Sequence, residues 1–411
     1  TTKMTYIKIF LIVITNAFYS QIAGQDFKSG RIDLTKNSLD FRNLEMQETN
    51  ETNIFWLGEF HGTKLNFEVS FNIFKHLVET VGISHILLES TFFNEIHLNK
   101  YLKTGNEKYL EIIYSNSNKT FSYNKESREY YKKIYELNIT LEPEKRFDFV
   151  SLDVEHNFIA SHKYIKECVN KHIGENSSLL ISQIDTLRFN TRRDYALFYR
   201  DLKNDIRKNE DEYKKLLNTY LDTLDYMVNN IWFNFVSSWS QDYNNFRDSL
   251  IWVNFSTRDS VLNFGTKKSF GKWGMNHIYQ SRTKDNVGWL AYRIRENHKD
   301  IKQNSTVMLY SDCEFMMPSF YVPQGLKFLF GARKKDFINV RVFNSTRRPI
   351  KIKGTKKLVE NSLSDITFWE VKALPEKINL VHKKARDKET IDYFQNVILI
   401  RNSKATKPYD N

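Results

Sequence analysis

Short apolar runs recur along the chain, and each is bounded by polar or turn-forming residues. The runs are rich in isoleucine, valine and phenylalanine and have the length of β-strands. A continuous apolar run, rather than an alternating one, is typical of a strand that is buried on both faces of a parallel sheet. We therefore predict strands at 53–59, 85–90, 147–154, 268–275, 305–312, 337–343 and 396–402.

Helical patterns separate these runs. The stretch "KLNFEVSFNIFKHLVETVG" (64–82) places Leu65, Val69, Ile73 and Leu77 near one face, and Gly82 is a typical helix stop. The alternation of strands and helices predicts an α/β fold, with a mostly parallel sheet flanked by helices.

The middle of the chain has a different pattern. From 177 to 264 there is no glycine or proline, and opposite charges often stand four residues apart. Such spacing stabilises solvent-exposed helices. We predict a long helical insertion at about 177–264, within a single α/β domain that covers 25–411.

The N-terminal stretch has the layout of an export signal. A lysine-bearing start precedes an apolar segment from Ile9 to Phe18, and small residues follow around Ser20 to Gly24. The segment is shorter than the roughly 20 residues that span a bilayer. We predict a signal peptide over 1–24 and a secreted or periplasmic protein with no stable membrane span; an N-terminal anchor is the alternative.

Composition narrows the class of protein. The chain has 411 residues, of which 41% are hydrophobic and 15% aromatic, as in a folded protein. Its net charge of +12 is explained by a lysine-rich surface, and without a nucleic-acid motif we expect no nucleic-acid partner. Cys168 and Cys313 could form one disulfide, but they show no metal-binding spacing.

Several predicted strands end in ionisable residues: Glu59 with His61, then Glu89, then Asp153 with Glu155 and His156, and finally His277. In an open α/β sheet, ligands bind beyond the carboxyl ends of the strands. Taken singly, each residue has another explanation, as a turn, a helix cap or a buried imidazole. Together they favour a site, because a carboxylate at the end of an apolar strand is costly unless it is paired.

Five motifs carry a resemblance to a known family. "GEFHGT" (58–63) and "ILLES" (86–90) are similar to the first two strand ends of the erythromycin-esterase-like superfamily. "NFRDSLIWVNF" (245–255) and "GKWGMNHI" (271–278) resemble its later helix and strand end, and "DYFQNVILIRNSKATKP" (392–408) its closing strand. The wider group includes ChaN-like haem- or iron-uptake proteins and TraB/TIKI-like peptidases.

The resemblance implies hydrolysis of an ester, a lactone or an amide. His61 is then the general base, and Glu59 or Glu89 orients it. His277 would stabilise the oxyanion or protonate the leaving group. Substrate binding would fall to Arg247, Asp153 and Asn254. One residue separates Glu59 from His61, whereas many antibiotic esterases have two, so macrolide specificity does not follow.

Two alternatives remain open at this point. Glu59, His61, Glu89 and His277 could instead coordinate a divalent metal ion, with a position left for water. A secreted protein with these residues could also bind haem or a metal without catalysis. A serine triad is disfavoured, because the sequence has no Gly-x-Ser-x-Gly motif.

Overall fold

The computed structural model describes residues 31–34, 50–172, 179–185, 189–328, 332, 335–347, 351–374, 380 and 388–410. The predicted signal peptide (1–24) lies outside these residues. Within them, no helix is both long and apolar enough to cross a membrane. Cys168 and Cys313 are both free thiols.

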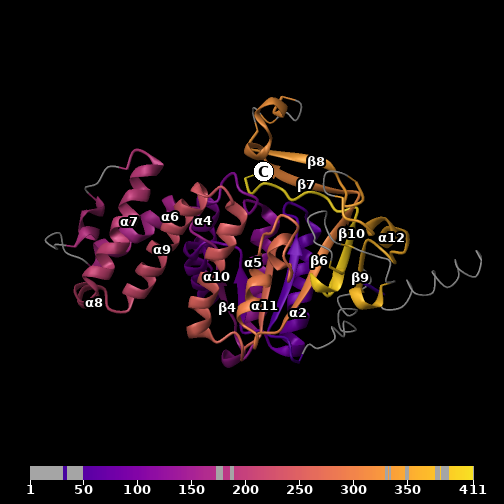
Figure 1. The fold of residues 1–411 in the computed structure, drawn as a ribbon, viewed down its shortest axis with the longest axis horizontal. Helices are drawn as coiled ribbons and strands as arrows, with labels where there is room; N and C mark the ends of the chain where they lie inside the picture. Colours follow the sequence, from indigo (N-terminus) through magenta and orange to yellow (C-terminus); the bar gives the residue numbers. More distant parts are fainter. Residues whose placement is uncertain are drawn as a thin grey trace, which may run out of the picture.

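An eight-stranded sheet forms the centre of the molecule (Figure 1). Its strands stand in the order β1-β9-β10-β6-β2-β5-β3-β4. From β10 to β4 all neighbouring strands are parallel, whereas β9 and β1 are antiparallel to their neighbours. The eight strands are β1 (Arg31–Asp33), β2 (Ile54–Glu59), β3 (His85–Leu88), β4 (Asp148–Ser151), β5 (Ser269–Gly274), β6 (Gln303–Ser311), β9 (Ile366–Glu370) and β10 (Asn396–Arg401).

The α/β fold with a mostly parallel sheet is confirmed. The apolar run at 53–59 is β2, a central strand whose six residues are all buried. The run at 337–343 is a strand as predicted, β8 (Phe337–Phe343), but its assignment to the parallel sheet is wrong, because it lies outside the main sheet. It pairs antiparallel with β7 (Cys313–Pro318) in a separate two-stranded sheet.

Helices cover both faces of the sheet. Phe55 and Leu57 of β2 belong to one apolar core, shared with helices α2 to α5, while Ile54 and Trp56 belong to a second core, shared with α10 and α11. The alternation follows from the pleat of the strand. These helices are α2 (Leu65–Val81), α3 (Phe92–Thr104), α4 (Lys108–Asn116), α5 (Lys125–Ile139), α10 (Tyr243–Leu262) and α11 (Leu290–Asn297). A further short helix, α12 (Thr355–Glu360), lies beside β9 and β10 (Figure 1).

Helix ends follow their capping residues. Helix α2 stops where predicted, at Gly82, whose φ of 72° lets its N–H bond the carbonyl of Leu77. Helix α3 starts at Thr91, whose side chain accepts from the N–H of Asn94. This cap stands two residues after Glu89 and fixes the path of the chain after β3.

A group of helices stands beside the β4 edge of the sheet (Figure 1, left). It consists of α6 (Phe158–His172), α7 (Arg192–Lys208), α8 (Glu210–Leu217) and α9 (Tyr220–Trp239), with a core of its own that also includes Phe92 and Phe93 of α3. Helix α10 then runs back along the sheet. This return brings residues near 247 to the carboxyl ends of the strands.

The β7–β8 hairpin lies apart from the main sheet, above the turn that follows β2 (Figure 1). The N–H of Met316 on β7 donates to the carbonyl of Gly62 at 2.9 Å, and Thr406 N–H donates to the same oxygen at 2.9 Å. The backbone of Gly62 has φ of +93°, and a side chain there would meet the Met316 carbonyl. Glycine at this position therefore lets the hairpin pack against the turn that carries His61.

Candidate active site

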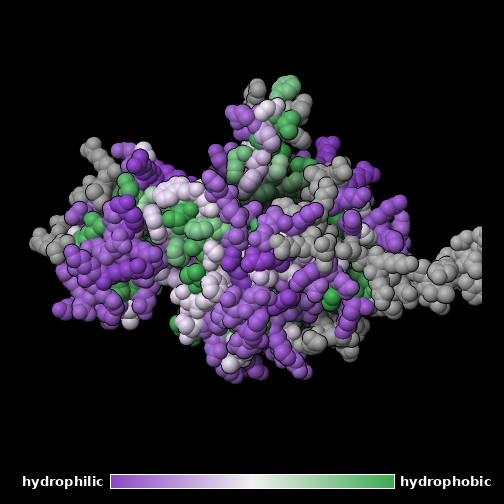
Figure 2. Space-filling view, in the orientation of Figure 1, coloured by the Kyte–Doolittle hydropathy of each residue, from purple (hydrophilic) through white to green (hydrophobic). Residues whose placement is uncertain are grey.

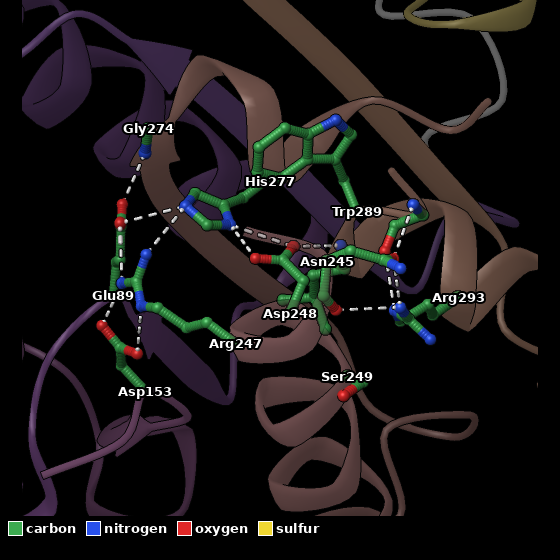
Figure 3. Close-up of polar contacts among 12 residues, drawn as sticks. Glu89, Asp153, Asn245, Arg247, Asp248, Ser249, Gly274, His277, Trp289 and Arg293 are labelled. Atoms are coloured by element: carbon green, nitrogen blue, oxygen red, sulfur yellow. Dashed lines mark hydrogen bonds and ion pairs between the residues drawn. The ribbon is translucent and has the colours of Figure 1, made fainter. Parts of the chain in front are cut away.

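Four neighbouring strands, β2, β5, β3 and β4, present ionisable side chains at their carboxyl ends. Because these strands are adjacent and parallel, the residues after each of them meet at one edge. Glu59 with His61, His277, Glu89 and Asp153 come from these four ends, and α10 adds Arg247 and Asp248. Figure 3 shows the part of this cluster around His277.

Glu59 and His61 form a hydrogen-bonded pair. His61 Nδ1 lies 2.8 Å from Glu59 Oε1. Lys272 of β5 lies against the same carboxylate, with Nζ 2.7 Å from Oε1. Burial would raise the pKa of Glu59, but Lys272 and His61 together lower it. Glu59 is therefore ionised and holds the proton of His61 on Nδ1, which leaves Nε2 as the basic nitrogen.

Burial would lower the pKa of His61, yet its hydrogen bond and charge interaction with Glu59, helped by Glu89, raise it above the ordinary value. The side chain keeps 39% of its surface exposed. The His61 side chain is thus partly accessible to solvent, and its Nε2 faces Glu89 Oε2 at 4.0 Å.

Glu89 lies at the centre of the cluster. Its Oε2 accepts the N–H of Gly274 at 2.6 Å, and its Oε1 lies 3.2 Å from His277 Nε2 and 3.3 Å from Arg247 Nη2. Burial would raise the pKa of Glu89, but His277, His61 and Arg247 hold it well below the ordinary value. Glu89 is a carboxylate across the working pH range.

His277 is held between two carboxylates (Figure 3). Nδ1 lies 2.8 Å from Asp248 Oδ1 while Nε2 faces Glu89. Burial alone would lower the pKa of His277, but Asp248 and Glu89 raise it to about 10. His277 is therefore a buried imidazolium at neutral pH, and Arg247 Nη1, 3.4 Å from Nε2, is a neighbouring cation rather than a hydrogen-bond donor to it.

Arg247 and Asp153 close the cluster on the β4 side. Arg247 Nε donates to Asp153 Oδ1 at 3.0 Å, and Nη2 donates to Oδ2. This bidentate geometry is the strong form of an arginine–carboxylate pair. Asp153 is almost entirely buried, and its Oδ1 also accepts the N–H of Val154 at 2.8 Å. It holds Arg247 rather than facing a substrate.

Gly274 makes room at the middle of the site. A side-chain Cβ there would lie 3.3 Å from Glu89 Oε2, 3.4 Å from His277 Cδ2 and 3.7 Å from His61 Nε2. The backbone of Gly274 (φ −57°, ψ 136°) suits any residue. A methyl group here would press on Glu89 Oε2 and make ordinary contacts with His277 and His61, so the surroundings rather than the backbone conformation favour glycine.

Asn254 does not join this cluster. Its Nδ2 donates to the carbonyl of Leu152 at 2.9 Å and to Asn230 Oδ1 at 2.5 Å. The side chain is buried and ties α10 to α9 and to the end of β4. It therefore packs these elements together, and the position predicted for substrate binding is occupied by the protein itself.

Two members of the site, Lys272 and Asp248, were not predicted, and His156 was predicted only as one of the ionisable residues at a strand end. Lys272 has a local signal, since a lysine stands inside the otherwise apolar strand "SFGKWG". Asp248 adjoins Arg247 in the quoted helix motif. His156, which follows β4, is 48% exposed and has Nδ1 3.6 Å from Asp153 Oδ2, so it borders the buried charges.

The cluster does not suit a metal ion. Among the described residues, no group of three or more histidine, cysteine, aspartate or glutamate side chains is arranged to hold one. The physical reason lies in the partners: Lys272 neutralises Glu59, and Arg247 and the His277 imidazolium neutralise Glu89. A divalent cation would have to displace these positive groups.

No protein-family model matches the chain, and no curated protein matches it either. A solved structure described as a succinoglycan biosynthesis protein matches with a TM-score of 0.66 and 14% identity, over 94% of this chain and 99% of that one. A protein from Bacillus cereus matches with a TM-score of 0.63 and 13% identity, over 95% and 98%.

A third match is a histidine-to-asparagine mutant of the erythromycin esterase EreC, in its open conformation. The TM-score is 0.61 at 13% identity, over 91% of this chain and 96% of that one. Identities this low show a shared fold. The resemblance predicted from the sequence motifs is thereby confirmed at the level of the fold.

Proposed function

Because the chain folds like an erythromycin esterase, we propose that it is a hydrolase of the erythromycin-esterase-like superfamily. In this proposal, water attacks the carbonyl carbon of an ester, a lactone or an amide. The observation that carries it is the Glu59–His61 pair, with Nδ1 bound to the carboxylate at 2.8 Å and the side chain accessible to solvent.

The proton transfers follow from the tautomer. His61 Nε2 accepts a proton from water as the water oxygen bonds to the carbonyl carbon. The resulting imidazolium is stabilised by Glu59 and lies 4.0 Å from Glu89. It then returns the proton to the leaving oxygen or nitrogen as the bond to that atom breaks. The products are a carboxylic acid and an alcohol or amine.

The remaining residues support this pair. Glu89 Oε2 and His61 Nε2 are far enough apart to share one bridging water, which Glu89 would orient. His277 and Arg247 keep Glu89 ionised and fixed in place. His277 is thus a positioning residue in this mechanism rather than the oxyanion stabiliser or acid of the first interpretation, since both of its ring nitrogens already face carboxylates, those of Asp248 and Glu89.

The competing function, capture of haem or a metal without turnover, is less well supported, because the carboxylates already have protein cations as partners. Export remains part of the proposal. It rests on the N-terminal pattern alone, and sequencing the N-terminus of protein from the culture medium or periplasm would test it.

The first experiment is a panel of esters, lactones and amides with wild type, His61→Asn and His298→Asn. His298 is a matched control, since it also pairs with an aspartate (Nδ1 3.4 Å from Asp259 Oδ2) but lies on another part of the fold. We expect His61→Asn to lower kcat at least about a hundredfold and His298→Asn to retain it. Wild-type turnover in properly folded His61→Asn would refute the mechanism.

A further inference from the structure

A row of aromatic rings begins at His61 and continues away from the buried charges. The His61 and Phe121 ring centres are 5.5 Å apart, and those of Phe121 and Tyr321 are 5.3 Å apart. Phe320 extends the row, with its ring centre 4.2 Å from that of Tyr321. Successive rings are tilted by 45°, 31° and 32°.

The rings come from separate segments that are each held in place. Phe121 stands in the turn before α5, where the next aromatic residue, Tyr123, stacks on Phe337 at 6.1 Å and 7°. Phe320 and Tyr321 lie in the turn after β7, where the N–H of Ser319 donates to the carbonyl of Asp336 at 2.8 Å. The row is therefore built by the packing of the hairpin against the α5 turn.

The outer rings face solvent. Phe320 and Tyr321 are each 56% exposed, and hydrophobic residues gather on the projecting hairpin in Figure 2. Exposed apolar surface beside a reactive group often marks a ligand-binding area. The nearby charged pair, Lys119 with Asp336 at 3.3 Å, is satisfied internally.

We propose that Phe121, Tyr321 and Phe320 bind an aromatic acyl group of the substrate, which extends from a carbonyl held at His61. This inference rests on the proposed hydrolase function and names its substrate class. A planar ring gains edge-to-face or offset contacts with tilted rings, which an alkyl chain of equal size does not. The charged residues beside the row, Lys119 and Asp336, pair with each other, so the surface that the row itself presents is aromatic.

A binding experiment tests the surface without turnover. Phenylpropanamide and nonanamide, whose acids have the same number of carbons, are titrated into wild type, Phe121→Leu, Tyr321→Leu and a control, Phe71→Leu. Leucine keeps apolar bulk and removes the ring. Phe71 lies on α2 under Lys133, whose Nζ is 5.5 Å from its ring centre, and so belongs to another surface.

We expect wild type and Phe71→Leu to bind the phenyl amide about tenfold more tightly than the alkyl amide, and both site variants to lose most of this preference. Equal binding of the two amides by wild type would overturn the inference. The inference would also be overturned if Phe121→Leu and Tyr321→Leu both kept the preference for the phenyl amide while their melting temperatures matched that of wild type.

Hydrolysis of the corresponding methyl esters separates this inference from the proposed function. The site variants should raise KM for methyl phenylpropanoate while kcat stays within about threefold, since the rings contact the acyl group and not the reacting atoms. An aromatic preference in binding without hydrolysis by wild type would refute the hydrolase and retain the surface. Hydrolysis by wild type with no aromatic preference in binding would support the hydrolase and refute the aromatic surface.

Discussion

Glu59 Oε1 receives two donors at once, His61 Nδ1 and Lys272 Nζ. This sharing sets the charge of the group. With His61 neutral, Glu59 and Lys272 cancel; with His61 protonated, the three carry one positive charge. Because a largely buried cluster favours zero net charge, Lys272 favours the neutral histidine that a general base requires.

Lys272→Met reverses this balance, since only protonated His61 then cancels Glu59. Glu89, which faces His61 Nε2, already raises the pKa of His61, and the loss of Lys272 should raise it further. The pKa already lies above 6.5, so activity, which needs neutral His61, falls as pH drops through it.

We expect the acid limb of the kcat/KM profile to move about one pH unit higher in Lys272→Met. Lys268→Met is the control, because that lysine precedes β5 and donates to the Thr52 carbonyl at 2.9 Å instead. A limb that stays in place or moves to lower pH would contradict the charge argument.

Gly274 offers a test of the space within the site. In Gly274→Ala, the methyl group would press on Glu89 Oε2 at 3.3 Å and fill the space beside His277 and His61, while the backbone stays relaxed. We expect a loss of about tenfold or more in kcat, from a misplacement of well under 1 Å, and a melting temperature within a few degrees of wild type. In Gly325→Ala, whose added methyl meets nothing within 4 Å, both quantities should be unchanged.

Among the elements, the β7–β8 hairpin and the turn after β2 depend on each other. In Gly62→Ala, Cβ would lie 2.1 Å from the Met316 carbonyl oxygen, and φ of +93° is strained for alanine. The hairpin must then shift away from the turn that carries His61.

We expect Gly62→Ala to lower the free energy of unfolding by at least about 2 kcal/mol and to reduce activity. Denaturant titration measures the first quantity. Gly82→Ala is the matched control, because its φ is also positive (+72°) but its surroundings are open, so only the backbone strain of about 1 kcal/mol remains. Equal losses in the two variants would show that the hairpin contact contributes nothing.

At the scale of the whole molecule, each carboxylate of the site has a protein cation beside it. Three positive groups, Lys272, Arg247 and the His277 imidazolium, face the four carboxylates of Glu59, Glu89, Asp153 and Asp248. A free cation would therefore compete with protein cations for every one of these carboxylates.

Chelation therefore provides a test of the whole site. Dialysis of the purified protein against EDTA should leave kcat within about twofold of the untreated value, because protein cations already occupy the positions next to the carboxylates. Loss of turnover that added zinc or another divalent ion restores would overturn this prediction and make the metal alternative the correct one.

The sequence by itself determined the main strands, α2 and the residues at the strand ends. Apolar runs such as "NIFWLGE" can be satisfied only by burial, and parallel strands bring their carboxyl ends to one edge. These are local or nearly local properties, so Glu59, His61, Glu89 and His277 could be named without coordinates.

The tertiary structure decided the rest, because it depends on partners distant in the chain. Only the strand order places Lys272 beside Glu59, and only the return of α10 brings Arg247 to Asp153. Packing between α9, α10 and β4 buries Asn254. Strand β8 likewise pairs with β7 and not with the main sheet. The apolar pattern of "FINVRVF" suits a strand in either sheet, so only the whole fold decides which partner it takes.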